Sequence, residues 1–197
     1  ASFTESKFNL NISYRPPFHW ENILSYYSMH RIPFIETVTK EVYQRVFKVN
    51  SSIGFFTAKN NPKKSQLEIE ILTQDPKTLF TVVNRIRKMF DLNSDPALII
   101  NQFEPFPYLK SLIDESPGFR IASGWDPFEI AIGTILGQVV SVSQASNLVG
   151  EMVRNYGEKI IHPITNESTF LFPSPEILSE ASLEEIKTSQ QRKHAIR

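Results

Sequence analysis

The 197-residue sequence contains no cysteine and no apolar run long enough to span a membrane. A chain without thiols forms neither disulfides nor thiolate metal sites, which excludes thiol redox chemistry and mildly favours the cytosol. A membrane helix needs about 18 apolar residues, and a secretory signal needs an apolar core. The N-terminal part of the chain alternates polar and apolar residues and forms no such core. We therefore expect a soluble, cytoplasmic protein without a membrane partner.

A strong basic patch is also absent, and the formal net charge is zero. The charge is unevenly distributed, with 14 basic and 10 acidic residues up to Lys110, and 7 basic and 11 acidic residues after it. This imbalance of +4 against −4 is compatible with two units of separate origin, although charge runs are more often solvated faces. With 41% hydrophobic residues, the chain can bury the core of one large domain or two small ones.

The N-terminal half has the pattern of an antiparallel sheet with two helices. Alternating polarity over 8–14 predicts a half-buried strand, which two prolines end before a helix at 20–29. Asp75 and Pro76 supply the N-cap and first position of a second helix, which continues to about Leu92. Four more strands are expected at 34–38, 43–49, 53–58 and 67–72. We assign residues 1–110 to this α+β domain.

A proline-rich junction precedes a helical second half. Residues 93–124 contain four prolines and predict at most short helices, which places a domain junction near 105–116. Residues 111–197 are expected to form an all-α domain. Its last helices should start near Ser174 and Ser182, which both have cap-like surroundings.

The segment that begins at Asp126 is a helix start. Asp126 suits the N-cap, Pro127 suits the first helical position, and Glu129 can reach back to the cap N–H. An apolar stripe with helical spacing follows and is expected to face the core. It comprises Phe128, Ala131, Ile132, Ile135, Leu136 and Val139.

Two glycines interrupt this helix on another face. Gly133 and Gly137 each cost about 1 kcal/mol relative to alanine in an isolated helix, so something is expected to approach them closely. We prefer a tightly packed neighbouring helix to a nucleic-acid backbone as the approaching group.

An interhelical bend is predicted at 138–141. Ser141 and Gln144 form a second capping pair, and the helix that they open is expected to end with Gly157 just beyond it. The bend therefore contains two β-branched apolar residues, Val139 and Val140, at positions where the chain leaves a helix.

Two groups of motifs carry a family resemblance. The N-terminal group is Tyr14-Arg-Pro-Pro-Phe18, Trp20, Ile35-Glu-Thr-Val38, Tyr43-Gln-Arg45 and Met89-Phe-Asp-Leu92. The second group is Pro117-Gly118, Asp126-Pro-Phe-Glu129, Ile135-Leu-Gly-Gln138, Val140-Ser141, Ala145, Tyr156-Gly157, Phe172-Pro173 and Pro175. In order and spacing, the chain resembles the bacterial 3-methyladenine DNA glycosylase II family, the alkylpurine branch of the helix-hairpin-helix DNA glycosylases.

The resemblance implies a fold and an activity. It implies an N-terminal α+β domain like one repeat of the TATA-binding protein, followed by an incomplete all-α glycosylase domain. The implied activity is repair of double-stranded DNA by excision of alkylated purines such as 3-methyladenine, through base flipping and hydrolysis of the N-glycosidic bond. This chemistry needs no metal and no cofactor. We expect the protein to act as a monomer.

The resemblance also implies roles for three residues of the bend. Val139 takes the position of the residue that fills the gap left by a flipped base, although its spacing alone would place it in the core. Gln138 is expected to bond a groove edge or to cap the bend. Ser141 opens a helix whose N-terminus suits a phosphate, and without the resemblance it is only an N-cap.

Tyr26 corresponds to an aromatic residue that lines the base pocket in the family. A ring face attracts a cationic alkylated purine. The alternative is that Trp20, Tyr26 and Tyr27 all pack on the sheet, since they lie on one amphipathic segment.

No catalytic residue is assigned within the sequence. The resemblance implies that the glycine-rich hairpin and the catalytic aspartate lie beyond residue 197, so that this piece alone should be inactive and should bind DNA weakly. Two other functions stay open. The first is an 8-oxoguanine-type glycosylase, whose family resemblance implies an Asn-rich wedge at the bend and a lysine nucleophile. Gln138 and Val139 at the bend argue against this function. A non-catalytic DNA-damage-binding domain is the other.

Overall fold

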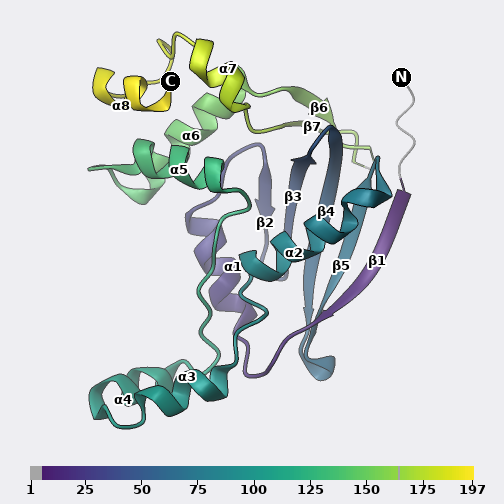
Figure 1. Ribbon diagram of the computed structural model, residues 1–197, viewed down its shortest axis with the longest axis vertical. Helices are drawn as coiled ribbons and strands as arrows, with labels where there is room; N and C mark the ends of the chain where they lie inside the picture. The colour runs from purple at the N-terminus through teal and green to yellow at the C-terminus, as the bar shows by residue number, and fades with distance from the viewer. Residues whose placement is uncertain (1–5, 164) are drawn as a thin grey trace.

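The computed structural model describes residues 6–163 and 165–197, which form an α+β fold (Figure 1). The strands are β1 (Ser6–Ser13), β2 (Glu36–Val38), β3 (Val42–Val49), β4 (Ser52–Asn61), β5 (Gln66–Thr73), β6 (Lys159–Ile161) and β7 (Ser168–Phe170). The helices are α1 (Trp20–Met29), α2 (Leu79–Met89), α3 (Pro96–Phe103), α4 (Pro107–Glu115), α5 (Pro127–Gly137), α6 (Val142–Tyr156), α7 (Pro175–Glu180) and α8 (Gln190–Ile196). Short 3-10 helices η1 (Pro62–Lys64) and η2 (Pro76–Thr78) precede β5 and α2.

The five N-terminal strands form one antiparallel sheet in the order β1-β5-β4-β3-β2. Its register pairs Phe8 with Ile71 and Val46 with Phe55, so apolar positions of neighbouring strands lie on the same face. The chain order of strand, helix, four strands and helix is the predicted one, and the α+β class is confirmed.

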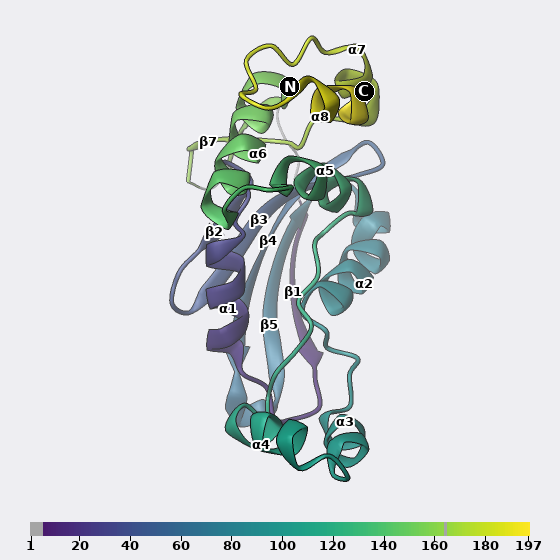
Figure 2. The same cartoon turned by 90° about the vertical axis from the view of Figure 1, so that its left-hand side faces the viewer.

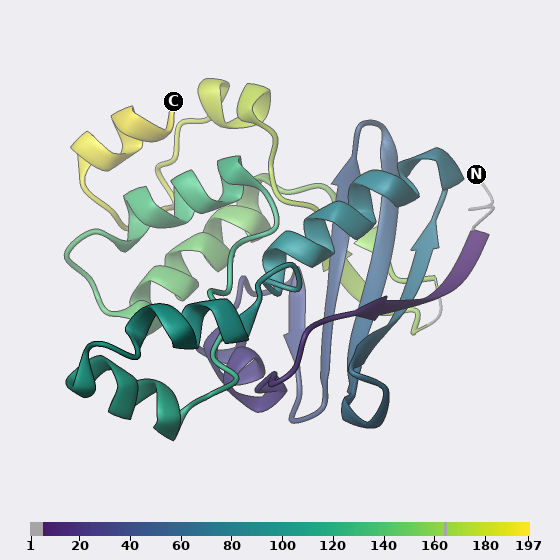
Figure 3. The ribbon, with the colours of Figure 1, turned by 60° about the horizontal axis from the view of Figure 1, so that its bottom comes forward.

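The two faces of the sheet contribute to two different cores. Successive residues of a strand point to opposite faces, so Phe47 packs with α1 and α2 while its neighbour Val46 packs with the helical second half. Figure 3 shows α2 lying across the first face. The second face instead contacts apolar side chains of α6 and of the segment after β7, which include Met152 and Leu171. The sheet is thereby the common support of both halves.

Helices α3 and α4 occupy the predicted junction. Figure 2 places them at the end of the molecule opposite α7 and α8. Each begins with a proline after its N-cap residue, because proline lacks the N–H that the first helical position leaves unpaired. The helices are short, as predicted, and α4 covers most of 105–116. Among the described helices, none combines the length and the apolar character that a bilayer crossing requires.

The second half differs from the prediction in two places. A β6–β7 hairpin follows α6, so this part of the chain is not wholly helical. Its strands have three residues each, which is too short for a recognisable alternation. The helix predicted at Ser174 is α7, but the helix predicted at Ser182 is wrong. That stretch is a turn, and the next helix, α8, starts only after the N-cap Ser189.

The close helix packing expected at the two glycines of α5 is also wrong in part. A Cβ on Gly133 would have no described atom within 4 Å, and one on Gly137 would lie an ordinary 3.5 Å from Cβ of Ala145 on α6. The tight approach occurs instead on α6, where a Cβ at Gly150 would lie 2.8 Å from Cγ of Pro33.

Candidate nucleic-acid interface

The bend between α5 and α6 presents Val139 to solvent. Helix α5 ends at Gly137, Gln138 is extended, and Val139 has a φ of 57°. The residue is 99% exposed. A β-branched residue in the left-handed region is unusual and costs on the order of 1–3 kcal/mol. The core interpretation of Val139 is therefore wrong, because the helix ends before the stripe reaches it.

The apolar stripe of α5 is shorter than its spacing predicts. Ile132 and Leu136 are buried, whereas Phe128 and Ile135 are half-buried and Ala131 is exposed. The buried pair therefore defines the face of α5 that packs on the second core.

Side chains and caps fix both ends of the bend. The Arg192 guanidinium on α8 donates to the backbone carbonyl of Gln138 and to the Thr188 hydroxyl, the latter at 3.2 Å. Ser141 is the N-cap of α6, and its hydroxyl accepts from the backbone N–H of Gln144 at 3.2 Å. The Gln138 and Ser141 side chains are exposed beside Val139. Gln138, Val139 and Ser141 are thus all exposed, while Val140 between them is half-buried and lines the neighbouring pocket.

A pocket of about 350 Å³ lies next to the bend, between α1 and the α5–α6 pair. Its lining includes Tyr26, His30, Gly133, Gly137 and Val140. Tyr26 is 42% exposed, and its ring stacks on His30 with centroids 4.2 Å apart. By contrast, Trp20 and Tyr27 are buried in the first core. The aromatic residues of α1 are therefore divided, and only Tyr26 joins the pocket with an exposed ring.

Buried charges line the inner part of the pocket. Arg45 on β3 donates to both carboxylate oxygens of Glu129 on α5, at 2.9 and 2.8 Å. It also donates to Glu36 on β2 at 3.2 Å, and the Tyr43 hydroxyl donates to the same Glu36 oxygen at 2.6 Å. The expected return of Glu129 to its own helix cap is therefore wrong, because the buried guanidinium takes both of its oxygens.

Sequence reasoning missed this network as part of the site. The available signal was Arg45, a charged residue within the largely apolar run of β3. A fully buried arginine needs carboxylate partners. Their identity cannot be predicted from residue spacing, because they can lie far away along the chain. Glu129 lies 84 residues away from Arg45.

Burial shifts the pKa values of these groups. Burial lowers the pKa of Arg45, but Glu129, Tyr43 and Glu36 together outweigh burial, so the net shift is upward and the guanidinium stays charged. The pKa of Glu129 is raised, chiefly by burial and further by the Glu36 and Asp126 carboxylates, although Arg45 opposes this shift. The pKa values of the Tyr27 and Tyr43 hydroxyls lie well above their usual value, chiefly through burial. Both pocket carboxylates are engaged by Arg45, so neither is placed to act as a free catalytic carboxylate.

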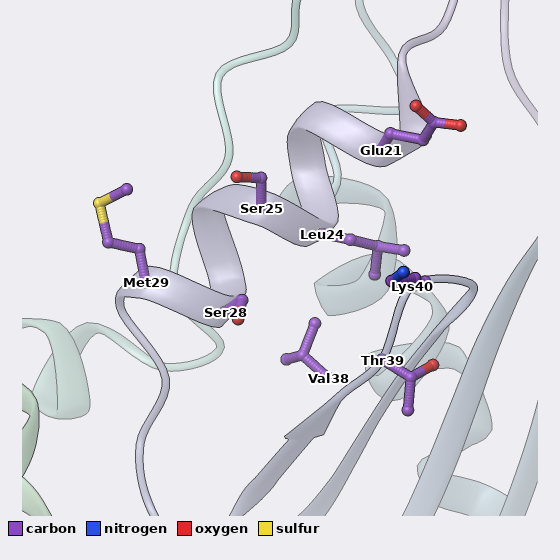
Figure 4. A pocket seen from close by; sticks show the side chains of 8 residues that line it. All are labelled: Glu21, Leu24, Ser25, Ser28, Met29, Val38, Thr39 and Lys40. Atoms are coloured by element: carbon purple, nitrogen blue, oxygen red, sulfur yellow. The ribbon is translucent and has the colours of Figure 1, made fainter.

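A larger hollow of about 760 Å³ lies along a different part of α1. Figure 4 shows its lining, in which Glu21 and Met29 come from α1 and Lys40 from the turn after β2. Its described lining contains no aromatic ring and none of the predicted site residues. The smaller pocket beside Val139 is therefore the better candidate for a site that holds a flat base.

Comparisons with known proteins find relatives that cover most of this chain. The chain is 28% identical over 180 residues to the probable bifunctional transcriptional activator/DNA repair enzyme AlkA of Mycobacterium tuberculosis, covering 91% of this chain and 36% of the relative. It is 26% identical over 176 residues to the DNA-3-methyladenine glycosylase 2 of Escherichia coli, covering 89% and 59%. The chain thus spans from about a third to three fifths of the length of these relatives.

Solved structures share the fold at low sequence identity. The 3-methyladenine DNA-glycosylase from Archaeoglobus fulgidus superposes with a TM-score of 0.79 at 15% identity, covering 96% of this chain and 64% of that one. The 8-oxoguanine glycosylase/lyase of Clostridium acetobutylicum, in complex with double-stranded DNA, has a TM-score of 0.63 at 17% identity, covering 91% and 57%.

The family match covers more than half of the chain. The sequence model of the AlkA N-terminal domain matches residues 9–126, from β1 to the N-cap of α5. This match and the two relatives confirm the resemblance drawn from the motifs. The chain belongs to the AlkA N-terminal domain family.

Proposed function

We propose that the complete protein is a DNA glycosylase that excises alkylated purines, such as 3-methyladenine, from double-stranded DNA. One observation carries the proposal: Val139 is 99% exposed, with a φ of 57°, at a bend that borders a base-sized pocket. The exposed Val139 makes no packing contacts with the described residues that would stabilise this backbone conformation. Strained positions of this kind cluster at functional sites. The similarity to the DNA-3-methyladenine glycosylase 2 of Escherichia coli supports the reaction.

The proposed role of Val139 is to fill the gap in the duplex. Extruding a base leaves an unstacked space, and unstacking costs a few kcal/mol. An apolar side chain inserted from a projecting bend recovers part of that cost. Its exposed isopropyl group has the required chemistry, because an apolar group gains free energy when it leaves water for the base stack.

The neighbours of Val139 have proposed roles in holding the duplex. The exposed amide of Gln138 can donate to and accept from base edges in a groove. The N-terminus of α6, capped by Ser141, favours an anionic phosphate, because its N–H groups and helix dipole point toward solvent. These contacts would set the register of the duplex and leave Val139 at the lesion.

The pocket would receive the flipped base on the exposed ring of Tyr26. An alkylated purine carries positive charge, and a cation over an aromatic face gains about 0.5–2 kcal/mol. Hydrolysis then needs a carboxylate to stabilise the oxocarbenium-like sugar while the cationic base leaves. We propose that this carboxylate comes from a part of the protein outside these 197 residues. The reaction needs no metal or cofactor, and we propose that it takes place in the cytoplasm with a monomeric protein.

A base-release assay tests the function. The full-length protein is incubated with methylated duplex DNA, and released bases are separated by chromatography. Release of 3-methyladenine is expected. Release only of 8-oxoguanine from a matched duplex would overturn the alkylpurine assignment. Tight binding of damaged duplex without release of any base would overturn the enzyme and leave a damage-binding protein.

A further inference from the structure

Three glycines line the pocket beside Val139, and two of them are explained by their neighbours. A Cβ on Gly124 would lie 2.5 Å from Cγ1 of Ile130, so a side chain there would collide. A Cβ on Gly137 would lie 3.5 Å from the Cβ of Ala145, in ordinary contact with α6. The small residue at each of these positions has a local packing context.

Gly133 has no such context. It lies in the interior of α5, where glycine is less favourable than alanine. A Cβ built on it meets no described atom within 4 Å, so the fold itself does not require a glycine. Since Gly133 lines the pocket, the open space in front of it belongs to the pocket.

We infer that Gly133 is a specificity-determining residue, which keeps the pocket deep enough for a purine ring. The inference rests on the proposed function and names the feature that sets the size of the accepted base. At about 350 Å³ the pocket lies near the lower end of the range of ligand sites, roughly 300–1,000 Å³. A side chain at Gly133 would therefore remove a substantial share of its volume.

The surroundings limit how the pocket can compensate for an added side chain. Arg45 and Glu129 are fixed by a bidentate ion pair, and Tyr27 is fixed by donation to the carbonyls of Met89 and Ser123 at 2.6 and 2.7 Å. These walls cannot retreat without breaking buried polar contacts. The loss of space would fall on the ligand, and more on a two-ring purine than on a one-ring pyrimidine.

Two variants of Gly133 and one matched control test the inference. Gly133→Ala adds one methyl group, and Gly133→Leu adds an isobutyl group. Ala131→Leu adds a comparable volume to the same helix at an exposed position that does not line the pocket. All three are made in the full-length protein, and the midpoint of thermal unfolding is measured for each.

The first readout is base release from duplexes that differ only in the lesion, an alkylated purine or an alkylated pyrimidine. The second readout is the affinity for free 3-methyladenine, measured by calorimetry. We expect Gly133→Leu to lose at least tenfold in purine release and in free-base affinity, while pyrimidine release falls by a smaller factor. Gly133→Ala should unfold at a temperature no lower than the wild type, and Ala131→Leu should leave both readouts unchanged.

The outcomes separate this inference from the proposed function. A folded Gly133→Leu protein with wild-type purine release and free-base affinity would overturn the inference and leave the glycosylase assignment intact. An equal loss on both lesions, with free-base affinity unchanged, would also overturn it, because that result marks a contact with the DNA backbone. A wild-type protein that releases no base overturns the proposed function, whereas Gly133-dependent binding of free 3-methyladenine would still support the pocket assignment.

Discussion

At the scale of single residues, stability and proposed function make opposite demands on this protein. Val139 holds a backbone conformation that valine disfavours and exposes its whole side chain. Gly133 leaves open space beside α5, although alanine at this position would make the helix more stable. Both residues border the same pocket or its rim. We assign DNA and base recognition to these two positions, which lower stability without making packing contacts that compensate for it.

Relieving the strain at Val139 should stabilise the fold. Asparagine tolerates the left-handed region far better than valine does, so Val139→Asn should raise the free energy of unfolding by about 1 kcal/mol. For a chain of this size that corresponds to roughly 2–4 °C in the unfolding midpoint. The control is Val139→Thr, which stays β-branched and should not change the midpoint. A lower midpoint for Val139→Asn would show that the valine makes a packing contact.

The sequence predicted the location of these residues better than their environment. The bend at 138–141 follows from the cap at Ser141, and Val139 was a candidate through the family resemblance. The exposed fraction of Val139 could not be predicted, because its spacing continues the apolar stripe beyond the true end of α5. The open face of Gly133 also required the structure, since two glycines four residues apart usually indicate a packed helix pair.

At the scale of elements, α5 is tied to the sheet by a buried ion-pair network. Arg45 is 3% exposed, and its guanidinium also lies 5.2 Å from the ring centroid of Trp125, just before α5. The network joins Glu36 on β2 and Arg45 on β3 to Glu129 on the first turn of α5. It therefore positions the helix that carries Gly133 and leads into the bend.

Removing the Arg45 guanidinium should strongly destabilise the fold. Arg45→Ala leaves two buried carboxylates without their partner and should lower the free energy of unfolding by about 3–5 kcal/mol. Lys7→Ala, which removes an exposed ion pair with Glu70, should cost less than about 1 kcal/mol. Chemical denaturation measures both. If Arg45→Ala proved as mild as Lys7→Ala, the carboxylates would have to be satisfied by other groups.

Helix α8 should support the bend through Arg192. Its bond to the Gln138 carbonyl holds the residue that precedes Val139. In a double-mutant cycle on binding to a duplex with an abasic-site analogue, Arg192→Ala should reduce the effect of Val139→Ala, with a coupling of about 0.5–3 kcal/mol. Arg154→Ala, at an exposed site in the last turn of α6, is the control and should not couple. Additive effects of Arg192 and Val139 would contradict a positioning role.

Most elements could be predicted from periodicity and caps, and the exceptions have physical causes. Helix α1 and the strands of the sheet follow from clear periodic patterns, and α5 follows from its cap. The β6–β7 hairpin gains its place from tertiary contacts, such as the bond from the Phe170 N–H to the Phe34 carbonyl at 3.3 Å. The cap-like Ser182 leads only into a turn, where Leu183 has a φ of 56° and cannot continue a helix.

At the scale of the whole molecule, the sheet supports two cores, and each core holds helices that line the pocket. Helix α1 packs on one face with α2, while α5 and α6 belong to the second core. The pocket lies where these two groups meet. The division into residues 1–110 and 111–197 stays a proposal, and the uneven charge of the halves is consistent with it. With an excess of acidic residues after Lys110, we expect affinity for undamaged duplex to be low in this chain, because phosphate contacts need basic side chains.

The affinity of the full-length protein for two duplexes tests the proposed insertion of Val139 most directly. One duplex carries an abasic-site analogue, the other is undamaged, and each is titrated with wild type and Val139→Ala. We predict that Val139→Ala loses roughly tenfold in affinity for the abasic duplex, about 1.4 kcal/mol, while affinity for undamaged duplex is unchanged. An equal loss on both duplexes, or no loss on the abasic one, would contradict insertion of Val139 into the gap left by a flipped base.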